Sequence, residues 1–183
     1  ERDRELEGYP LGSVVDMVLS NSARPILLIE GDVPEADLLW TDILLFIEEV
    51  GTAEPCLAPT RTLAGKAAEA RMLHVIDSHM LTIVERAFRV ATELETTVAT
   101  EALTSALKKD MEHFLSGAKE LLDRTGHSSS FEIRVGDPVE TTRRFIQDHG
   151  PHLVVCNSVA PDERLVDSVA YNLAAYLREV PLL

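Results

Sequence analysis

The chain has 183 residues, of which 45% are hydrophobic and 5% aromatic, a composition typical of a folded domain and not of a disordered chain. Asp and Glu number 31 against 17 Lys and Arg, which gives a net charge of -14. Phosphate backbones and anionic lipids repel a chain this acidic, so we expect no nucleic-acid partner. The sequence contains no apolar run of about 18 residues, so we expect no direct membrane insertion of this chain.

The two cysteines, Cys56 and Cys156, have no C-x-x-C spacing. This argues against a disulfide framework and against a structural zinc site, and it favours a reducing, cytoplasmic location. The first residue, Glu1, is not a start methionine, and no signal peptide follows it. We therefore expect the chain to be a cut taken from a longer protein.

Short apolar runs alternate with helical patterns along the chain. The runs that predict strands are Ile26–Glu30, Asp42–Glu48, Arg71–Asp77, Ser130–Val135, His152–Asn157 and a sixth that begins at Val180. The helical patterns cover roughly Leu57–Ala70, Leu81–Leu122 (long enough to be broken), Pro138–His149 and Val166–Leu177. The runs are nearly all apolar, which favours parallel strands covered on both faces. The order predicts an α/β, Rossmann-like doubly wound sheet of five mainly parallel strands with helices on both faces.

One helix start is marked by the sequence Asp137-Pro138-Val139-Glu140. Asp suits the N-cap, Pro suits the first helical position, and Glu at the third position can reach back to the cap. Gly136 before them permits a tight turn out of a strand. The joint is adequately explained as a strand–turn–helix connection, although a helix start of this kind is also able to face an anion.

The two ends of the chain contain similar sequence segments. The segment that begins at Leu11, with Pro25 before its apolar run, resembles the segment that begins at Val166, with Pro181 before its apolar run. The offset is 166 − 11 = 155 at the helix and 181 − 25 = 156 at the proline. The spacing is about that of one α/β domain, so it predicts two tandem copies, unless two amphipathic helices are similar by chance. The predicted division is residues 1–35, the last helix and strand of a preceding copy, and residues 36–183, one nearly complete copy.

The order of these pieces resembles the universal stress protein family, over nearly all of residues 42–183 and a remnant at 9–30. Residues 43–48 resemble the family's first strand, 73–77 its second, and 152–157 its fourth. Residues 131–138, which end in Gly-Asp-Pro, match the family's strand and turn closely, and Gly12-Ser13-Val14 resembles the start of its last helix. The resemblance implies a Rossmann-like nucleotide-binding fold.

The nucleotide-binding members of the family carry G-x-x-G, nine residues and G-[ST] after the fourth strand, where backbone amides wrap the phosphates. The corresponding stretch here begins at Asn157 and reaches Ala160, and six residues later come Asp167 and Ser168. All three glycines are changed, three residues are missing, and Asp167 places a carboxylate where phosphate oxygens would lie. Glu48 replaces the usual Asp at the end of the first strand.

These departures predict that the complete copy does not hold ATP in the family's manner, and hence that the chain has no cofactor. If the degenerate site is used nonetheless, the resemblance implies that ATP would contact seven residues. They are Glu48, Ile76, Asn157, Ala160 and Ser168, with Gly12 and Ser13 from the first copy.

Sequence motifs for a metal site or for an enzyme active site are weak or absent. His74, Asp77 and His79 form H-x-x-D-x-H, but His74 and Asp77 lie on opposite faces of a strand, so we expect no metal site. A G-x-S-x-G elbow is absent, and Cys156 lies in an apolar strand, as expected of a buried hydrophobic residue. Without an acid, base and nucleophile that converge, we expect no enzymatic activity.

The leading interpretation is a non-catalytic regulatory and dimerisation module of universal stress protein type. One alternative is an ATP- or AMP-binding sensor, and another is a cytosolic regulatory domain of a membrane transporter or antiporter. We also expect residues 26–29 to cover a sheet edge near Leu182 and Leu183, in a homodimer or a pseudo-dimer, because an exposed apolar edge invites pairing.

Overall fold

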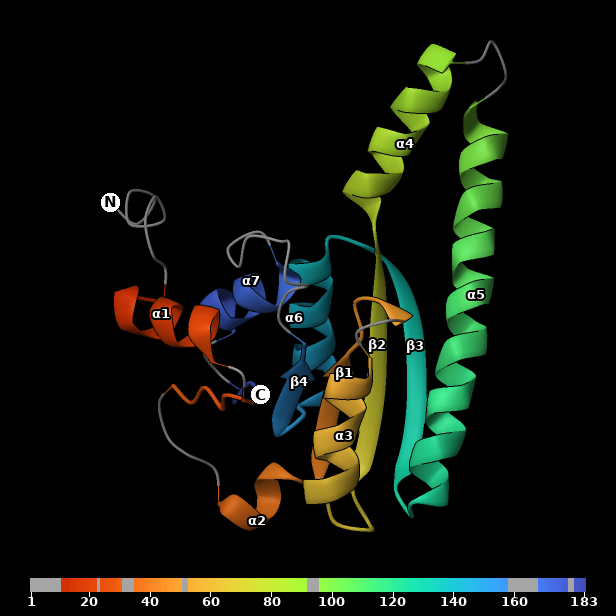
Figure 1. Ribbon diagram of the computed structural model, residues 1–183. Helices are drawn as coiled ribbons and strands as arrows, with labels where there is room; N and C mark the ends of the chain where they lie inside the picture. Colours follow the sequence, from red (N-terminus) through yellow and green to blue (C-terminus); the bar gives the residue numbers. More distant parts are fainter. Residues whose placement is uncertain are drawn as a thin grey trace.

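The computed structural model describes residues 11–22, 24–30, 35–50, 53–91, 96–157, 168–177 and 180–183. Four parallel strands form one sheet in the order β3-β2-β1-β4 (Figure 1). They are β1 (Asp42–Phe46), β2 (Glu69–Asp77), β3 (Ser128–Gly136) and β4 (Leu153–Cys156). Each coincides with a predicted apolar run, with ends that differ by at most two residues. The predicted α/β class and parallel sheet are confirmed.

Within the described residues the sheet has four strands and not five, so that prediction is wrong. The place beside β4 is taken by residues 181–183, where Val154 N–H donates to Pro181 O at 2.9 Å and Cys156 N–H donates to Leu183 O at 2.8 Å. Leu182 forms only isolated bridges, one parallel with Val154 and one antiparallel with Leu28. A segment this short, whose proline has no N–H, does not build a full ladder. The expected proximity of residues 26–29 to this segment is observed within one chain.

The helices cover both faces of the sheet, as the doubly wound pattern predicts. They are α1 (Ser13–Asn21), α2 (Ala36–Leu39), α3 (Glu54–Leu63), α4 (Ser78–Ala91), α5 (Thr96–Arg124), α6 (Pro138–His149) and α7 (Val169–Tyr176). The helix predicted over Leu57–Ala70 is wrong at both ends. Helix α3 begins at Glu54 and stops at Leu63, before Gly65, because the chain must turn there to enter β2. The long helical pattern is broken into α4 and α5, as its length allowed, and Val166, the predicted start of the last helix, lies outside the described residues.

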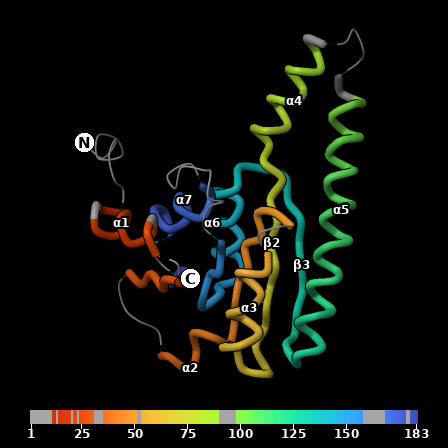
Figure 2. Tube along the Cα trace, in the orientation of Figure 1, coloured from red at the N-terminus to blue at the C-terminus, as the bar shows by residue number. Residues whose placement is uncertain are grey.

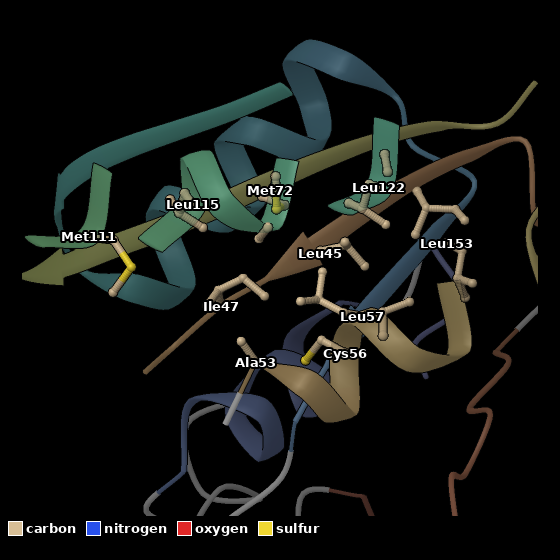
Figure 3. Close-up of a cluster of buried hydrophobic side chains, with 14 of the residues drawn as sticks. Leu45, Ile47, Ala53, Cys56, Leu57, Met72, Met111, Leu115, Leu122 and Leu153 are labelled. Carbon is tan, nitrogen blue, oxygen red and sulfur yellow. The ribbon is translucent and has the colours of Figure 1, made fainter. Parts of the chain in front are cut away.

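Alternation along β1 produces two hydrophobic clusters, one on each face. Ile43, Leu45 and Ile47 point into a cluster completed by α3 and α5, which Figure 3 shows in close-up. Leu44 and Phe46 point to the opposite face, into a cluster completed by α6 and α7. Because both faces of β1 are buried, its all-apolar sequence follows directly from its central place in the sheet.

Helices α4 and α5 form a hairpin that extends well beyond the sheet (Figure 2). The α5 helix lies along β3, and α4 packs against α5. Several apolar side chains of the hairpin are exposed, among them Met80, Ile83 and Phe88 on α4 and Val98 on α5. None of the helices in the described ranges has the length and apolarity needed to cross a bilayer.

The N-terminus of α6 confirms part of the predicted joint. The Asp137 carboxylate accepts the Glu140 N–H at 2.8 Å, and Pro138 begins the helix. The Glu140 carboxylate forms ion pairs with Arg143 and Arg144, so its side chain is engaged along the helix and not at the cap.

Replacing Asp137 with alanine is expected to lower the free energy of unfolding by about 1 kcal/mol, because a helix amide loses its acceptor. Asp137→Asn is the matched control, since an amide oxygen still accepts the bond and is expected to retain most of the stability. Urea unfolding followed by circular dichroism measures both. Equal losses in the two variants would contradict the capping role.

Candidate functional site

The candidate site is the crevice at the carboxyl ends of β1 and β4. The chain proceeds from β1 outward to β2 and β3, whereas β4 adds on the other side of β1. In open α/β sheets, such a switch in direction leaves a crevice at the carboxyl ends of the two strands. Phe46 and Cys156 are paired in register there, so the residues that follow them, Glu48 and Asn157, come from the two walls of the crevice.

Cys56 joins these two walls. It lies in the first turn of α3, and its thiol faces Phe46 O, with the sulfur 3.8 Å from that oxygen. Burial raises the pKa of Cys56 to about 12, although the Asn157 backbone amide opposes this and the Glu48 carboxylate adds to it. Burial also raises the pKa of Cys156, and the Cys56 thiol and Glu48 contribute in the same direction. The crevice therefore places one carboxylate close to two protonated thiols.

The hydroxyl of Ser168 has a structural role. It caps α7 and accepts the Tyr171 N–H at 3.1 Å, and the residue is only 3% exposed. In the family motif that the sequence resembles, this hydroxyl and the helix amides face phosphate. Here the side chain already satisfies one of those amides, which reduces what the helix start can offer to an anion.

The other predicted nucleotide contacts are distributed unevenly. Ile76 is buried near the end of β2. Gly12 precedes α1 with φ of 88°, and none of the contacts described for Gly12 or Ser13 reaches Glu48 or Asn157. Ala160 lies outside the described residues. The structure thus brings Glu48 and Asn157 together around Cys56, and it places Gly12 and Ser13 at the start of a different element, α1.

The histidine motif at the end of β2 is occupied by local hydrogen bonds. A ring nitrogen of His74, Nδ1, lies 2.8 Å from Ile47 O, and Asp77 accepts the His79 N–H at 2.7 Å. Burial lowers the pKa of His74, partly offset by the Ile47 carbonyl, so its imidazole is neutral near pH 7. Within the described part of the chain, no group of three metal-binding side chains gathers in one place.

A cavity of about 320 Å³ lies beside the end of β4, and its lining includes Asn157, one of the predicted nucleotide contacts. Its walls come from segments far apart in the sequence: residues 22–28, the start of α3, the end of β4, α7, and Leu182 with Leu183. Most of its lining is aliphatic, and Arg24 and Tyr171 are among the polar members. Residues far apart in the sequence form these walls together, so no single local motif reveals the shape of the cavity.

Comparison with solved structures identifies the fold. No protein-family model and no curated protein matches the chain. Among solved structures, it is similar to hypothetical protein MJ0577, at 23% identity and a TM-score of 0.63, over 79% of this chain and 94% of that chain. It is also similar to a universal stress protein family member from Burkholderia pseudomallei, at 20% identity and a TM-score of 0.56, over 79% of this chain and 95% of that one.

A third similar structure is a universal stress protein from Archaeoglobus fulgidus DSM 4304, with 15% identity and a TM-score of 0.57. That match covers 94% of this chain but 53% of the other, so this chain spans about half of that protein. The four-stranded parallel order and the helices on both faces agree with these likenesses. The chain therefore has the universal stress protein fold.

Proposed function

We propose that the protein is a non-catalytic regulatory and dimerisation module of universal stress protein type, whose crevice does not hold ATP in the family's manner. The observation that carries this proposal is the stretch that follows β4, where all three glycines of the family's phosphate-binding motif are replaced. Glycines let backbone amides approach and wrap the phosphates, so their loss weakens the site that the family uses.

Two further features support the proposal. The Ser168 hydroxyl is committed to capping α7, and the sequence places Asp167 immediately before it in a loop that is three residues short of the family motif. Like charges at a few Å in a partly buried cleft are unfavourable by an amount on the order of kcal/mol.

The chemistry of the described crevice is also poorly suited to catalysis. Both thiols are held protonated, so neither is an activated nucleophile. The Nδ1 atom of His74 is engaged with the Ile47 carbonyl. A nucleophile needs an adjacent base within hydrogen-bond reach, and the contacts described for this crevice supply none.

Calorimetric titration tests the nucleotide part of the proposal. We expect no saturable binding of ATP with Mg²⁺, or of AMP, up to about 1 mM. A dissociation constant at that limit corresponds to a binding free energy of only about -4 kcal/mol. Micromolar binding by the natural sequence would overturn the proposal and favour an ATP- or AMP-binding sensor.

A matched variant asks whether charge is the reason. Asp167→Asn keeps the size of the side chain and removes its charge, so weak ATP binding that appears only in this variant would support electrostatic exclusion. Glu49→Gln is the control for a general change in net charge.

A further inference from the structure

The cavity beside the end of β4 differs in charge from the chain as a whole. None of the described residues that line it has an acidic side chain, although the chain carries 31 Asp and Glu. Its walls are mostly aliphatic, with Ile26 from the N-terminal segment, Val155 from β4 and Ala174 from α7. A concave, mostly apolar space of this kind removes a ligand from water and favours one with an apolar body.

Arg24 is the one charged side chain in the described lining of this cavity. The residue is exposed, which places its guanidinium at the mouth of the cavity. Ion pairs with nearby carboxylates engage six other arginines of the described ranges, which are Arg61, Arg71, Arg89, Arg134, Arg143 and Arg144. None of the ion pairs between described residues includes Arg24. Its guanidinium is therefore available to an anion, and its planar fork suits a carboxylate.

Two neighbouring hydroxyl groups in the lining are already engaged. Tyr171 Oη donates to Asp16 Oδ1 at 2.7 Å. The Ser22 hydroxyl accepts the Arg24 backbone N–H at 3.1 Å. A carboxylate placed at Tyr171 would also meet the charge of Asp16, whereas at Arg24 it meets a cation. The charged end of a ligand is therefore best placed at the mouth, with its apolar part inside.

We infer that this cavity binds a small aliphatic carboxylic acid, whose carboxylate pairs with Arg24 and whose chain lies against the walls from β4 and α7. The volume sets its size. At about 30 Å³ for each non-hydrogen atom, the space that a water molecule takes up in the liquid, the cavity of about 320 Å³ accommodates about ten such atoms. A straight-chain acid of about eight carbons, such as octanoate, has that number, whereas an adenine nucleotide is considerably larger.

The inference goes beyond the proposed function, because it adds a ligand to the regulatory module and does not depend on the state of the crevice. ATP binding would overturn the crevice proposal and leave the ligand of the cavity unchanged. Failure to bind octanoate, in turn, would leave the nucleotide prediction as it is.

Calorimetric titration with sodium octanoate tests the ligand class. We expect one saturable site with a dissociation constant of about 0.1 mM or below, which is within reach of a ligand of about ten non-hydrogen atoms. The uncharged 1-octanol is expected to bind at least about fivefold more weakly, and Arg24→Gln is expected to weaken octanoate binding by a similar factor. Arg86→Gln on α4 makes the same change in net charge away from the cavity and is the control. No saturable octanoate binding up to about 1 mM, or equal affinity for 1-octanol, would overturn the inference.

The location is tested by filling the cavity. Ile26 is half-buried in its wall, so Ile26→Trp is expected to weaken octanoate binding at least about tenfold. Ile29→Trp places the same ring on an exposed residue of the same segment, outside the described lining, and is expected to leave binding unchanged. Leu19→Trp, in the wall from α1, is a second filling variant if Ile26→Trp does not fold, as judged by circular dichroism. A folded filling variant that binds octanoate as tightly as the natural sequence would overturn the assignment to this cavity.

Discussion

In the native protein at pH 8, Cys56 is expected to react with iodoacetamide about 10²–10³ times more slowly than an exposed thiol. Burial raises the pKa of Cys56 to about 12 from an ordinary value of 9.0, so the reactive thiolate is about a thousandfold scarcer. Peptide mapping by mass spectrometry measures the rate at Cys56 separately from that at Cys156. A native rate within about tenfold of the exposed control would contradict the buried, protonated thiol.

The control is Leu63→Cys, which places a thiol at an exposed position of the same helix, α3. Unfolding in guanidinium is expected to expose Cys56 and Cys156 equally.

The raised pKa of Cys56 also makes the free energy of unfolding depend on pH, with a definite sign. The folded pKa is the higher one, so the Cys56 contribution to stability is present below pH 9 and is lost as pH rises from 9 toward 12. At pH 10 that loss is on the order of 1 kcal/mol, measured as the difference between the natural protein and Cys56→Ala relative to pH 8.

Replacing Leu45 with alanine is expected to lower the free energy of unfolding by about 3 kcal/mol. Leu45 lies in the central strand β1, is 0% exposed, and belongs to the cluster beneath α3 and α5. Truncation loses the burial of several methyl groups and leaves a cavity that a central strand cannot close. Urea unfolding measures this change in the free energy of unfolding.

Leu63→Ala is the matched control for Leu45→Ala, because Leu63 is 55% exposed and the same truncation there is expected to change stability by less than about 0.5 kcal/mol. If Leu45→Ala also fell within that limit, the placement of β1 at the centre of the sheet would be wrong.

The residues described at the switch point include the Glu48 carboxylate, the protonated Cys56 and Cys156 thiols, and the Asn157 backbone amide, which is directed at the Cys56 sulfur. Exposed apolar side chains on the described surface include Met80 and Ile83 of the α4–α5 hairpin. Such side chains are suited to the protein contacts that the proposed function requires.

Much of the sheet was predictable because its strands are buried on both faces. An apolar run such as Asp42–Glu48 or His152–Asn157 has few other places in a soluble α/β domain, and the structure ends these strands within two residues of the prediction. The start of α6 was equally predictable, since Asp137 and Pro138 act through local backbone geometry. Helix ends inside amphipathic stretches were harder, because periodicity continues past the point where the chain must turn, as at the end of α3.

The sequence by itself determined the α/β class, the places of the four strands along the chain and the loss of the glycines that would wrap a phosphate, because each depends on residue types at short spacing. It also revealed the repeated offset that links Leu11 to Val166. Only the tertiary structure decided that Glu48 lies beside two cysteines 100 residues apart, that Ser168 serves its own helix, and that Asp16 meets Tyr171. Contacts of this kind depend on how the chain ends pack against the sheet edge, and no local pattern encodes that packing.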